Sequence, residues 1–531
     1  NSSRSLQASY TLQSGRRGPA LNLTGLVGRL PAFLRHSDGG KALARPLVNL
    51  VPNSVRLTSG LLRNEGELLA YAVPVRRALD SQVVPSVSLL HTWRNAAGFG
   101  WQPLGMLNLR GDLASTRDLR RYSDSTTLGR LAGSARRNLF GMDVGVERDR
   151  QLSTSLVLAP RISSWLRPRY VTSSTFVLSR SLTSRQPIRE DGDSAGAFIL
   201  PQTLNNSRLR EVGAAIEIGR LGARLAGDSS GIGRALRRLR PLDISDRLTR
   251  NATFDLAAFD PSLGFQLALG GLNRFLRAQG DSAIGAAEVR NTTFQSGAEL
   301  PFGLSFQLAY SRLRTNRFQR GGGSFLTSES HQREWPRGNL RFLRPIRGFP
   351  VSLIGLGATF RSTTGSTLTP SSGGVTAVSR QRRSSVTPDL QLTFSNGIVV
   401  SGSWSMLNQR DLSGGNTTRV EQDDITAGVN HAIALPRSLS RARRIIRSQL
   451  TGILSTSTSC MQRRAQAACG VVSDNRRREL RATLDTDLSR IISGGLQFSY
   501  ALTEAKHINR AFSQMTVSAS FQLSLYAGDY R

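Results

Sequence analysis

Lysine is almost missing from this sequence of 531 residues, because only Lys41 and Lys506 occur and the other 68 of its 70 basic residues are arginine. Against 36 acidic residues this gives a formal net charge of +34. Proteins that bind nucleic acid commonly gather basic residues in clusters, since neutralising phosphates needs only charge. The arginines here are spread from Arg4 to Arg531, so the net charge alone does not identify a partner.

Long apolar runs are absent too. No stretch of about 18 apolar residues occurs, which excludes transmembrane helices, and the mean hydropathy is −0.24. The sequence starts at Asn1 without a charged and then apolar leader. We therefore expect a mature product or a piece of a longer protein, with any signal peptide upstream.

Cysteine occurs only twice, at Cys460 and Cys469, which enclose eight residues. A structural zinc site needs about four ligands, and no pair of histidines lies nearby in the sequence, so a metal site is not expected. Two thiols that close one short polar loop fit a disulfide in an oxidising compartment. A pair of free thiols is the alternative.

Catalytic motifs are scarce, and phosphate-binding glycine loops and His-Glu-x-x-His are missing. One match, Gly227-Asp-Ser-Ser-Gly231, fits a nucleophile elbow, with a strand-like stretch before it and a helix-like stretch after it. The helix-like stretch, Ile232 to Leu239, is rich in arginine and is stopped by Pro241. The alternating helices and parallel strands of a hydrolase are also missing. We therefore expect a polar connection between strands, no enzyme and no cofactor.

What the sequence does contain is strict alternation of apolar and polar residues. From residue 515 to 525 the pattern has period two over eleven residues, which is long enough for a strand to cross a bilayer at a tilt. A strand of a soluble sandwich usually has about five or six residues. We expect the apolar side chains to face lipid: Met515, Val517, Phe521, Leu523 and Leu525.

Residues 480–489 alternate in the same way, and their polar face carries Arg481, Asp485 and Asp487. A dry core cannot accept that face, whereas a water-filled lumen can. An arginine moved to the lipid side would cost about 2–4 kcal/mol at the membrane midplane. We therefore expect Arg481, Asp485 and Asp487 to face a lumen.

The connections between alternating segments differ in length. Asn396-Gly397 predicts a hairpin with a type I′ turn, in which both residues have positive φ. Long polar loops are expected at residues 312–337, 361–388, 408–424 and 460–478. Short turns on one side and long loops on the other are typical of outer-membrane barrels, whose long loops are extracellular.

We therefore expect an all-β chain. Residues 1–531 would form a single large antiparallel transmembrane β-barrel region, or the C-terminal part of such a barrel, with about 20–24 strands. Short amphipathic or connector segments are expected near 25–51 and 232–241. Five tryptophans lie near segment ends, either as interfacial residues or as ordinary half-buried ones: Trp93, Trp101, Trp165, Trp335 and Trp404.

Two stretches resemble a known family. The first contains Tyr122-Ser-Asp-Ser-Thr-Thr-Leu-Gly-Arg-Leu and then Leu156-Val-Leu-Ala-Pro-Arg-Ile-Ser-Ser-Trp-Leu-Arg-Pro-Arg-Tyr170. The second contains Ile232-Gly-Arg-Ala-Leu-Arg-Arg-Leu-Arg and then Phe259-Asp-Pro-Ser-Leu-Gly-Phe265. These resemble the C-terminal barrel region of the SprA/Sov-type outer-membrane translocon of the type 9 secretion system. The resemblance implies a very wide barrel that passes folded proteins, with a lateral opening, a plug and partner subunits.

The sequence departs from that family by being much shorter and richer in arginine, so alternatives stay open. The first candidate function is the passage of proteins through a translocon. The second is a porin for small anionic solutes, in which lumenal arginines such as Arg481 set selectivity. The third is a structural surface protein whose arginine-rich loops bind anionic polymers.

The expected location is the bacterial outer membrane. The expected partners are outer-membrane lipid and lipopolysaccharide, and further subunits or the remainder of a longer chain that closes the barrel. If the chain is a translocon, secreted protein cargo is expected too. Nucleic acid is not expected, because aromatic residues are not interleaved with the arginine clusters.

Overall fold

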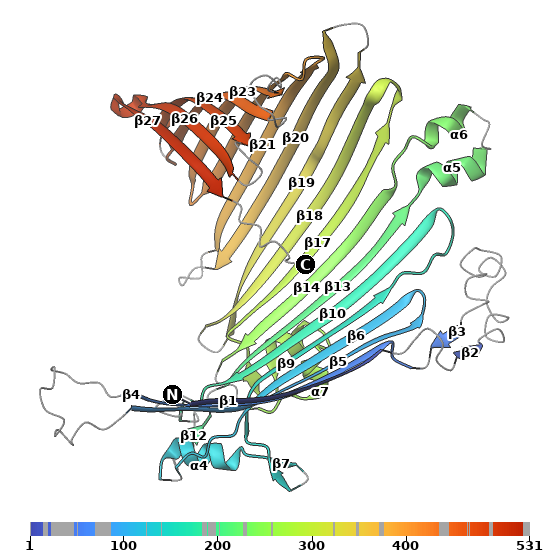
Figure 1. The fold of residues 1–531 in the computed structure, drawn as a ribbon, viewed down its shortest axis with the longest axis vertical. Coiled ribbons are helices and arrows are strands. Elements are labelled where there is room, and N and C mark those ends of the chain that lie inside the picture. The colour runs from blue at the N-terminus through green and yellow to red at the C-terminus, as the bar shows by residue number, and fades with distance from the viewer. Residues whose placement is uncertain are drawn as a thin grey trace, which may run out of the picture. The chain divides into compact units, whose positions relative to one another are not determined.

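A computed structural model gives the fold of the chain (Figure 1). The structure describes residues 2–13, 20–22, 47–49, 51–68, 86–123, 125–139, 141–182, 188–189, 198–200, 202–226, 231–255, 259–321, 324–346, 350–370, 376–434, 445–464, 466, 468–487 and 492–523. The expected connector near 25–51 lies almost entirely outside these residues.

The chain is all-β, and 19 of its strands belong to one large antiparallel sheet, as the alternation predicted. They are β1 (Ser2–Gln13), β4 (Ser54–Leu68), β5 (Ser86–Leu104), β6 (Leu107–Asp118), β9 (Val146–Leu158), β10 (Leu166–Arg180), β13 (Gln202–Ile216), β14 (Leu242–Phe254), β17 (Gly285–Glu299), β18 (Leu304–Gly321), β19 (Ser324–Pro345), β20 (Val351–Pro370), β21 (Thr376–Phe394), β22 (Val399–Ser413), β23 (Asn416–Ala434), β24 (Ile445–Gln462), β25 (Gly470–Asp487), β26 (Ile492–Ala505) and β27 (Arg510–Leu523). The expected number was 20–24, and the difference arises because the strands are longer than expected, from 12 to 22 residues.

Shorter elements are placed between these strands. The two-residue and three-residue strands pair as β2 (Ala20–Asn22) with β3 (Leu47–Asn49), β7 (Asn138–Leu139) with β8 (Met142–Asp143), β11 (Ile188–Arg189) with β12 (Phe198–Ile199), and β15 (Arg277–Ala278) with β16 (Asp281–Ser282). The helices are α4 (Thr127–Ser134), α5 (Ile218–Ala226), α6 (Gly231–Leu236), α7 (Leu263–Gln266), α8 (Leu272–Leu276), η1 (Pro301–Gly303) and η2 (Lys506–Ile508). In the part of the chain that the structure describes, no helix is long and apolar enough to cross a membrane.

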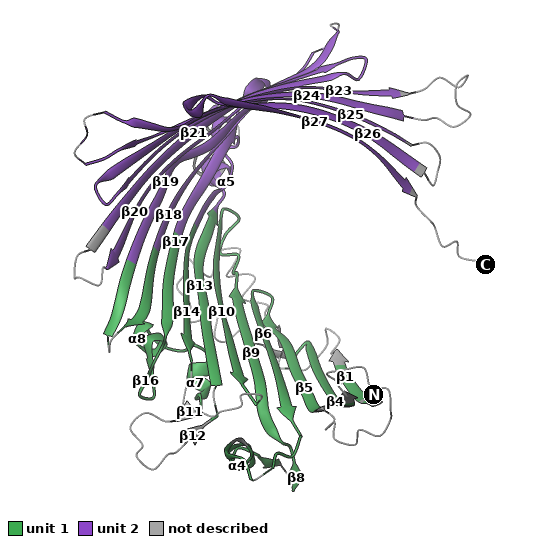
Figure 2. Ribbon diagram, turned by 90° about the vertical axis from the view of Figure 1, so that its left-hand side faces the viewer, with its two compact units in different colours: residues 1–215, 245–291, 315–328 green, residues 216–244, 292–314, 329–531 purple. Residues whose placement is uncertain are grey.

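The chain divides into two compact units (Figure 2). Unit 1 comprises residues 1–215, 245–291 and 315–328, and unit 2 comprises residues 216–244, 292–314 and 329–531. In unit 1, the strands from β1 through β4, β5, β6 and β9 to β10 pair one after the other. In unit 2, β20 to β27 form consecutive antiparallel hairpins.

The four expected long loops are mostly strand, so that prediction was wrong. In these stretches the strands end and the next ones begin at residues 321 and 324, 370 and 376, 413 and 416, and 462 and 470. Both faces of the strand ends carry polar side chains there, so period two disappears from the sequence while the backbone ladder continues. The stretches are therefore the far ends of long hairpins.

The hairpin at Asn396-Gly397 is present, but its turn differs from the expected type I′. Gly397 has φ +85°, whereas Asn396 is not among the described residues with positive φ. The side-chain Oδ1 of Asn396 instead accepts a hydrogen bond from the N–H of Ile398 at 3.2 Å. This local Asx bond fixes the first half of the turn without left-handed backbone.

The segment near 232–241 contains the expected short helix, as α6, and Leu239 then forms a bridge with Ala298. The stretch before it is the helix α5 and not a strand, which removes one half of the nucleophile-elbow pattern. The two helices pack closely, because a Cβ on Gly222 would lie 2.7 Å from Cβ of Leu236. Residues 227–230 of the motif itself lie outside the described residues.

The connection from residue 119 to 145 is held by a buried cluster of polar side chains. Asp118, which is fully buried, accepts hydrogen bonds from Arg120 Nη2 at 2.6 Å and from the hydroxyl of Tyr122 at 3.0 Å. Arg120 Nη2 also donates to the hydroxyl of Tyr122 at 2.7 Å. Burial, and then the negative charge of Asp118, raise the pKa of Tyr122 to about 12, so the phenol stays neutral and remains a donor.

We expect Asp118→Asn to loosen this connection, because the substitution leaves the Arg120 guanidinium without its buried counter-charge. Breaking a buried ion pair costs about 3 kcal/mol or more. Amide hydrogen exchange over residues 119–145 would accelerate by about two orders of magnitude. Asp112→Asn on the same strand is the matched control, because its pair with Arg110 is half exposed; equal acceleration in both variants would contradict the assignment.

Candidate functional site: a strand wall with two chemically different faces

One face of the C-terminal strands of unit 2 is apolar. Register places Leu480 of β25 opposite Tyr500 of β26, which in turn lies opposite Met515 of β27. The next rows along the strands are Ala482, Phe498 and Val517, and then Leu484, Leu496 and Ala519. Leu480, Tyr500 and Met515 are 44%, 40% and 66% exposed, so no part of the described chain covers this face.

The apolar rows continue across β22, β23 and β24. Trp404 lies opposite Ile425, which lies opposite Leu454, and on β23 the same face continues to Ile433. Nine residues of strand correspond to about 27 Å along the strand axis. We call this surface of β22–β27 the apolar band. It approaches the apolar height of about 25 Å that membrane-spanning barrels show, once strand tilt is considered.

The opposite face of the same strands is polar. In β25, β26 and β27 its rows are Arg481, Ser499 and Thr516, then Thr483, Gln497 and Ser518, then Asp485, Gly495 and Ser520. Small hydroxyl and amide side chains dominate these rows, and charges are few. We call this surface the polar face. Because side chains alternate along a strand, the two faces are separated by a single residue step.

Glu479 is the centre of an ion network on the polar face. Its side chain is only 5% exposed, and its two oxygens accept hydrogen bonds from Arg477 Nη2 at 2.7 Å and from Arg481 Nη2 at 2.8 Å. Both arginines follow the same alternation, two residues before and two residues after the carboxylate. A buried carboxylate is tolerated here because both of its oxygens have a cationic partner.

A groove of about 440 Å³ also lies on unit 2, between β18, β19 and β20. Two of its lining residues, Arg337 and Arg361, are directly opposite each other across β19 and β20. Glu334 bridges them: Arg361 forms an ion pair with its carboxylate, and Arg337 Nη1 lies 3.8 Å from Oε2. Ser311 donates a further hydrogen bond to Glu334 at 3.1 Å.

Beyond the apolar band, on the same face, arginines lie side by side. Arg382 of β21 is directly opposite Arg410 of β22, and Arg410 is directly opposite Arg419 of β23. We call these three residues the arginine row. All three are exposed, and Arg419 pairs with Glu421. Like charges directly opposite each other destabilise a strand pair unless something anionic lies between them.

Most residues expected at the two surfaces lie together on one face or the other. Met515, Val517 and Phe521 belong to the apolar band, and Leu523 is the last residue of β27. Leu525 lies outside the described residues. Arg481 and Asp485 lie on the polar face, and Asp487 is the last residue of β25. That the two faces meet lipid and a lumen stays a prediction.

The sequence argument missed Glu479 and Arg477. Both share the parity of Arg481, so the alternation already placed them on the polar face. Arg477 was overlooked because residues 460–478 were expected to be a loop, and Glu479 because it lies between that loop and the alternating segment 480–489. The disulfide between Cys460 and Cys469 is confirmed, with the two Cα atoms 5.6 Å apart. It joins Cys460, near the end of β24, to Cys469, the residue before β25, and so lies at a hairpin tip rather than in a long loop.

No group of three or more His, Cys, Asp or Glu side chains in the described ranges lies close enough to hold a metal ion. No protein-family model and no curated protein sequence matches this chain.

Several solved structures are similar at low identity. The siderophore receptor PirA from Acinetobacter baumannii is 11% identical with a TM-score of 0.25, covering 91% of this chain and 76% of that chain. The alcaligin outer-membrane receptor FauA from Bordetella pertussis is 8% identical with a TM-score of 0.29, covering 88% and 82%. The β domain of the Bordetella autotransporter BrkA is 12% identical with a TM-score of 0.21, covering 45% and 92%. At such TM-scores these likenesses carry no argument about family or function.

We expect Glu479→Gln to destabilise unit 2, because two guanidinium groups lose their shared negative partner. The loss is about 2 kcal/mol, discounted from two charge-assisted bonds because both arginines are half exposed. Urea unfolding should show a lower midpoint. Glu421→Gln is the control, since the Arg419–Glu421 pair is exposed and worth about 0–1 kcal/mol. Equal midpoints for the two variants would refute the role given to Glu479.

Proposed function

We propose that this chain forms the wall of a channel in a bacterial outer membrane and that the channel passes secreted proteins. The apolar band is the observation that supports the proposed location in a membrane. Monomeric soluble proteins rarely expose a contiguous apolar patch larger than a few hundred Å². The band runs across six neighbouring strands with exposed Leu, Ile, Val, Phe and Trp side chains, and lipid is the partner that matches its extent and chemistry.

Strands are suited to this environment because their backbone groups pair with neighbouring strands. An unpaired edge in lipid would cost several kcal/mol for each backbone group. The outermost strands of the wall therefore pair with each other, with another subunit or with the remainder of a longer chain. Barrels of 16–18 strands already leave an aqueous channel, and this chain contributes 19 strands to one sheet.

Protein cargo is supported by the polar face and by the resemblance to the type 9 translocon. Ser, Thr and Gln side chains dominate the rows of β25–β27, and the charge of Glu479 is matched by neighbouring arginines. Such a surface offers a passing chain neither an apolar patch nor a field of one sign to which it would adhere.

The arginine row would bind the phosphate groups of lipid at the end of the apolar band. Arg410 lies six residues beyond Trp404 on the same face of β22, which is about 20 Å along the strand. Phosphate groups of lipopolysaccharide above the acyl chains would neutralise Arg382, Arg410 and Arg419 together and remove their mutual repulsion. We therefore propose that the arginine row lies at the outer leaflet.

A pore for small anionic solutes is the second candidate. The groove that Arg337 and Arg361 line favours it, because two guanidinium groups share one carboxylate there and keep a net positive charge. Lumenal arginines of this kind give anion selectivity in channels.

A pair of adjacent substitutions in β26 tests the assignment of the faces. We expect Leu496→Arg to cost about 2–4 kcal/mol in lipid vesicles, because it places a charge in the bilayer. Gln497→Arg, one residue away and on the opposite face, should cost less than about 1 kcal/mol. Urea unfolding of the reconstituted protein gives both values. Equal costs, or the reverse order, would refute a lipid-facing band.

Site-specific photo-crosslinking in secreting cells distinguishes the two channel functions. A photoreactive residue in place of Ser499, on the polar face, should trap secreted proteins as covalent adducts. The same residue in place of Phe498, on the apolar band, should trap none. If Ser499 yields no protein adducts while vesicles that contain the chain take up small anions, protein passage is wrong and the solute pore is favoured.

A further inference from the structure

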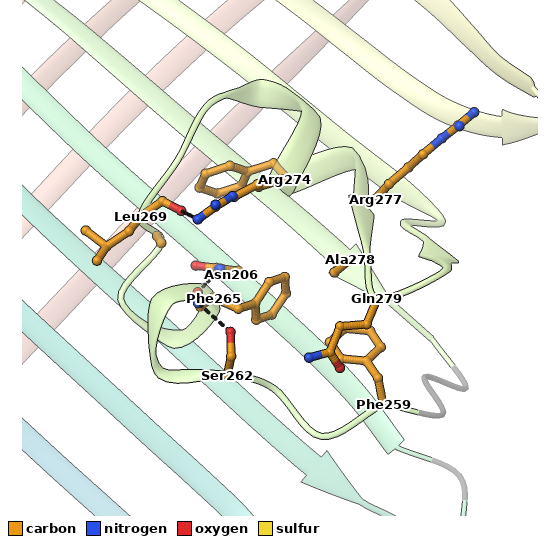
Figure 3. Close-up of a pocket in the computed structure, with 11 residues that line it drawn as sticks. Asn206, Phe259, Ser262, Phe265, Leu269, Arg274, Arg277, Ala278 and Gln279 are labelled. Carbon is orange, nitrogen blue, oxygen red and sulfur yellow. Dashed lines mark hydrogen bonds between the residues drawn. The ribbon is translucent and has the colours of Figure 1, made fainter.

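A cavity of about 270 Å³ lies in unit 1, between β13 and the segment of residues 259–284 (Figure 3). This segment connects β14 to β17 and contains α7, α8, β15 and β16. It covers buried side chains of the sheet, among them Phe176, Leu204 and Phe254. The channel function proposed above makes no use of this segment or of its cavity.

Polar side chains of β13 fix the position of the segment. Gln202 Nε2 donates a hydrogen bond to the carbonyl of Phe259 at 2.9 Å, and Arg208 Nη1 donates to the carbonyl of Ala268 at 3.2 Å. Between them, Asn206 Nδ2 donates to the carbonyl of Phe265. Three side chains from one face of one strand therefore hold the backbone of the segment, so the cavity is preformed.

Aromatic rings form the wall of the cavity. Phe259 and Phe265 meet edge to face with their centroids 5.5 Å apart, and both contact Phe254 in the same way. Phe275, which is 2% exposed, completes the lining on the side of α8. Edge-to-face contacts of this kind hold the rings in place, so the wall presents a fixed apolar surface.

One residue that lines the cavity, Asn206, carries a buried acceptor that has no donor. Asn206 is only 3% exposed, and its Oδ1 has no hydrogen-bond partner although its Nδ2 is bound to Phe265. An unsatisfied buried acceptor costs about 1–3 kcal/mol. Because Asn206 lines the cavity, a ligand that carries an N–H or O–H group would recover this cost.

Two arginines are among the residues that line the same cavity, and the side chain of Arg277 points away from it (Figure 3). Arg274 and Arg277 are exposed, and neither has an ion-pair partner among the described residues. Arg274 Nη1 donates to the carbonyl of Leu269 at 3.3 Å, which orients its guanidinium group. Ala268 and Gln279, which also line the cavity, have φ values of +54° and +48°. Residues other than glycine rarely adopt this left-handed conformation, and it is often found at binding sites.

We propose that this cavity binds a small organic anion that combines an aromatic or aliphatic body with a hydrogen-bond donor. The body lies against the phenylalanine wall, the donor reaches Oδ1 of Asn206, and the anionic group pairs with Arg274. The volume, slightly below the range of about 300–1,000 Å³ for ligand pockets, limits the ligand to about the size of a single ring with a short polar tail.

Hippurate is a suitable probe, because it has a phenyl ring, an amide N–H and a carboxylate. Equilibrium dialysis of radiolabelled hippurate against the detergent-solubilised chain, corrected for protein-free micelles, should show saturable binding of one molecule per chain. Benzoylglycolate, in which an ester oxygen replaces the N–H, should bind at least ~10-fold more weakly because it faces Asn206 with an acceptor. Methyl hippurate, which lacks the charge, should also bind more weakly.

Variants locate the binding to this cavity. Ala278→Leu should reduce hippurate affinity at least ~10-fold by filling the space, and Arg274→Gln should reduce it about 5-fold by removing a charge-assisted bond. Arg247→Gln, at an exposed arginine of β14 outside the cavity, should bind as the unmodified protein does. Heat-modified mobility in electrophoresis confirms that each variant is folded.

The proposal is wrong if hippurate shows no saturable binding, if benzoylglycolate and methyl hippurate bind as tightly as hippurate, or if both cavity variants keep full affinity. If Ala278→Leu does not fold, Arg274→Gln and the two ligand analogues still decide the outcome. The measurement needs only the folded chain, so its result is independent of whether the channel passes proteins, solutes or neither.

Discussion

The strand ladder is the constraint on which the rest of this structure depends. Each strand satisfies its backbone hydrogen bonds with its neighbours, so the sequence decides only which face each side chain takes. A slip of one residue between β25 and β26 would exchange Leu480 and Arg481 between the two faces. The apolar band, the polar face and the network around Glu479 all follow from a register that such a slip would destroy.

Sequence reasoning succeeded where the two faces differ in chemistry. Alternation in β23, β25, β26 and β27 was visible because one parity is apolar and the other is polar or charged, and the shared face of Met515, Val517 and Phe521 follows from it. The cysteine pair was also predictable, since two thiols separated by a short polar stretch have few partners to choose from. The short helix at 231–236 was visible from its arginines and the proline that follows.

The sequence failed where that contrast is lost. The far ends of β18–β25 carry polar side chains on both faces, so strands were taken for loops. The helix α5 lies among glycines and arginines that gave no clear period. The segment of residues 259–284 could not be recognised as a small core, because its phenylalanines pack on β10 and β14, which are distant in the sequence. Asn206 had no distinguishing signal either, since its role depends on which backbone carbonyl it meets.

The arginine row makes the pairing of neighbouring strands sensitive to salt. In the apolar band, neighbouring strands are stabilised by side chains whose contacts do not depend on dissolved ions. Six residues further along β22, the facing side chains Arg382, Arg410 and Arg419 repel one another, and that repulsion is screened over about 8–10 Å by physiological salt. With the proposed placement of the apolar band in a bilayer, the same hairpins would therefore depend on bilayer thickness at one level and on the ionic composition of the medium at another.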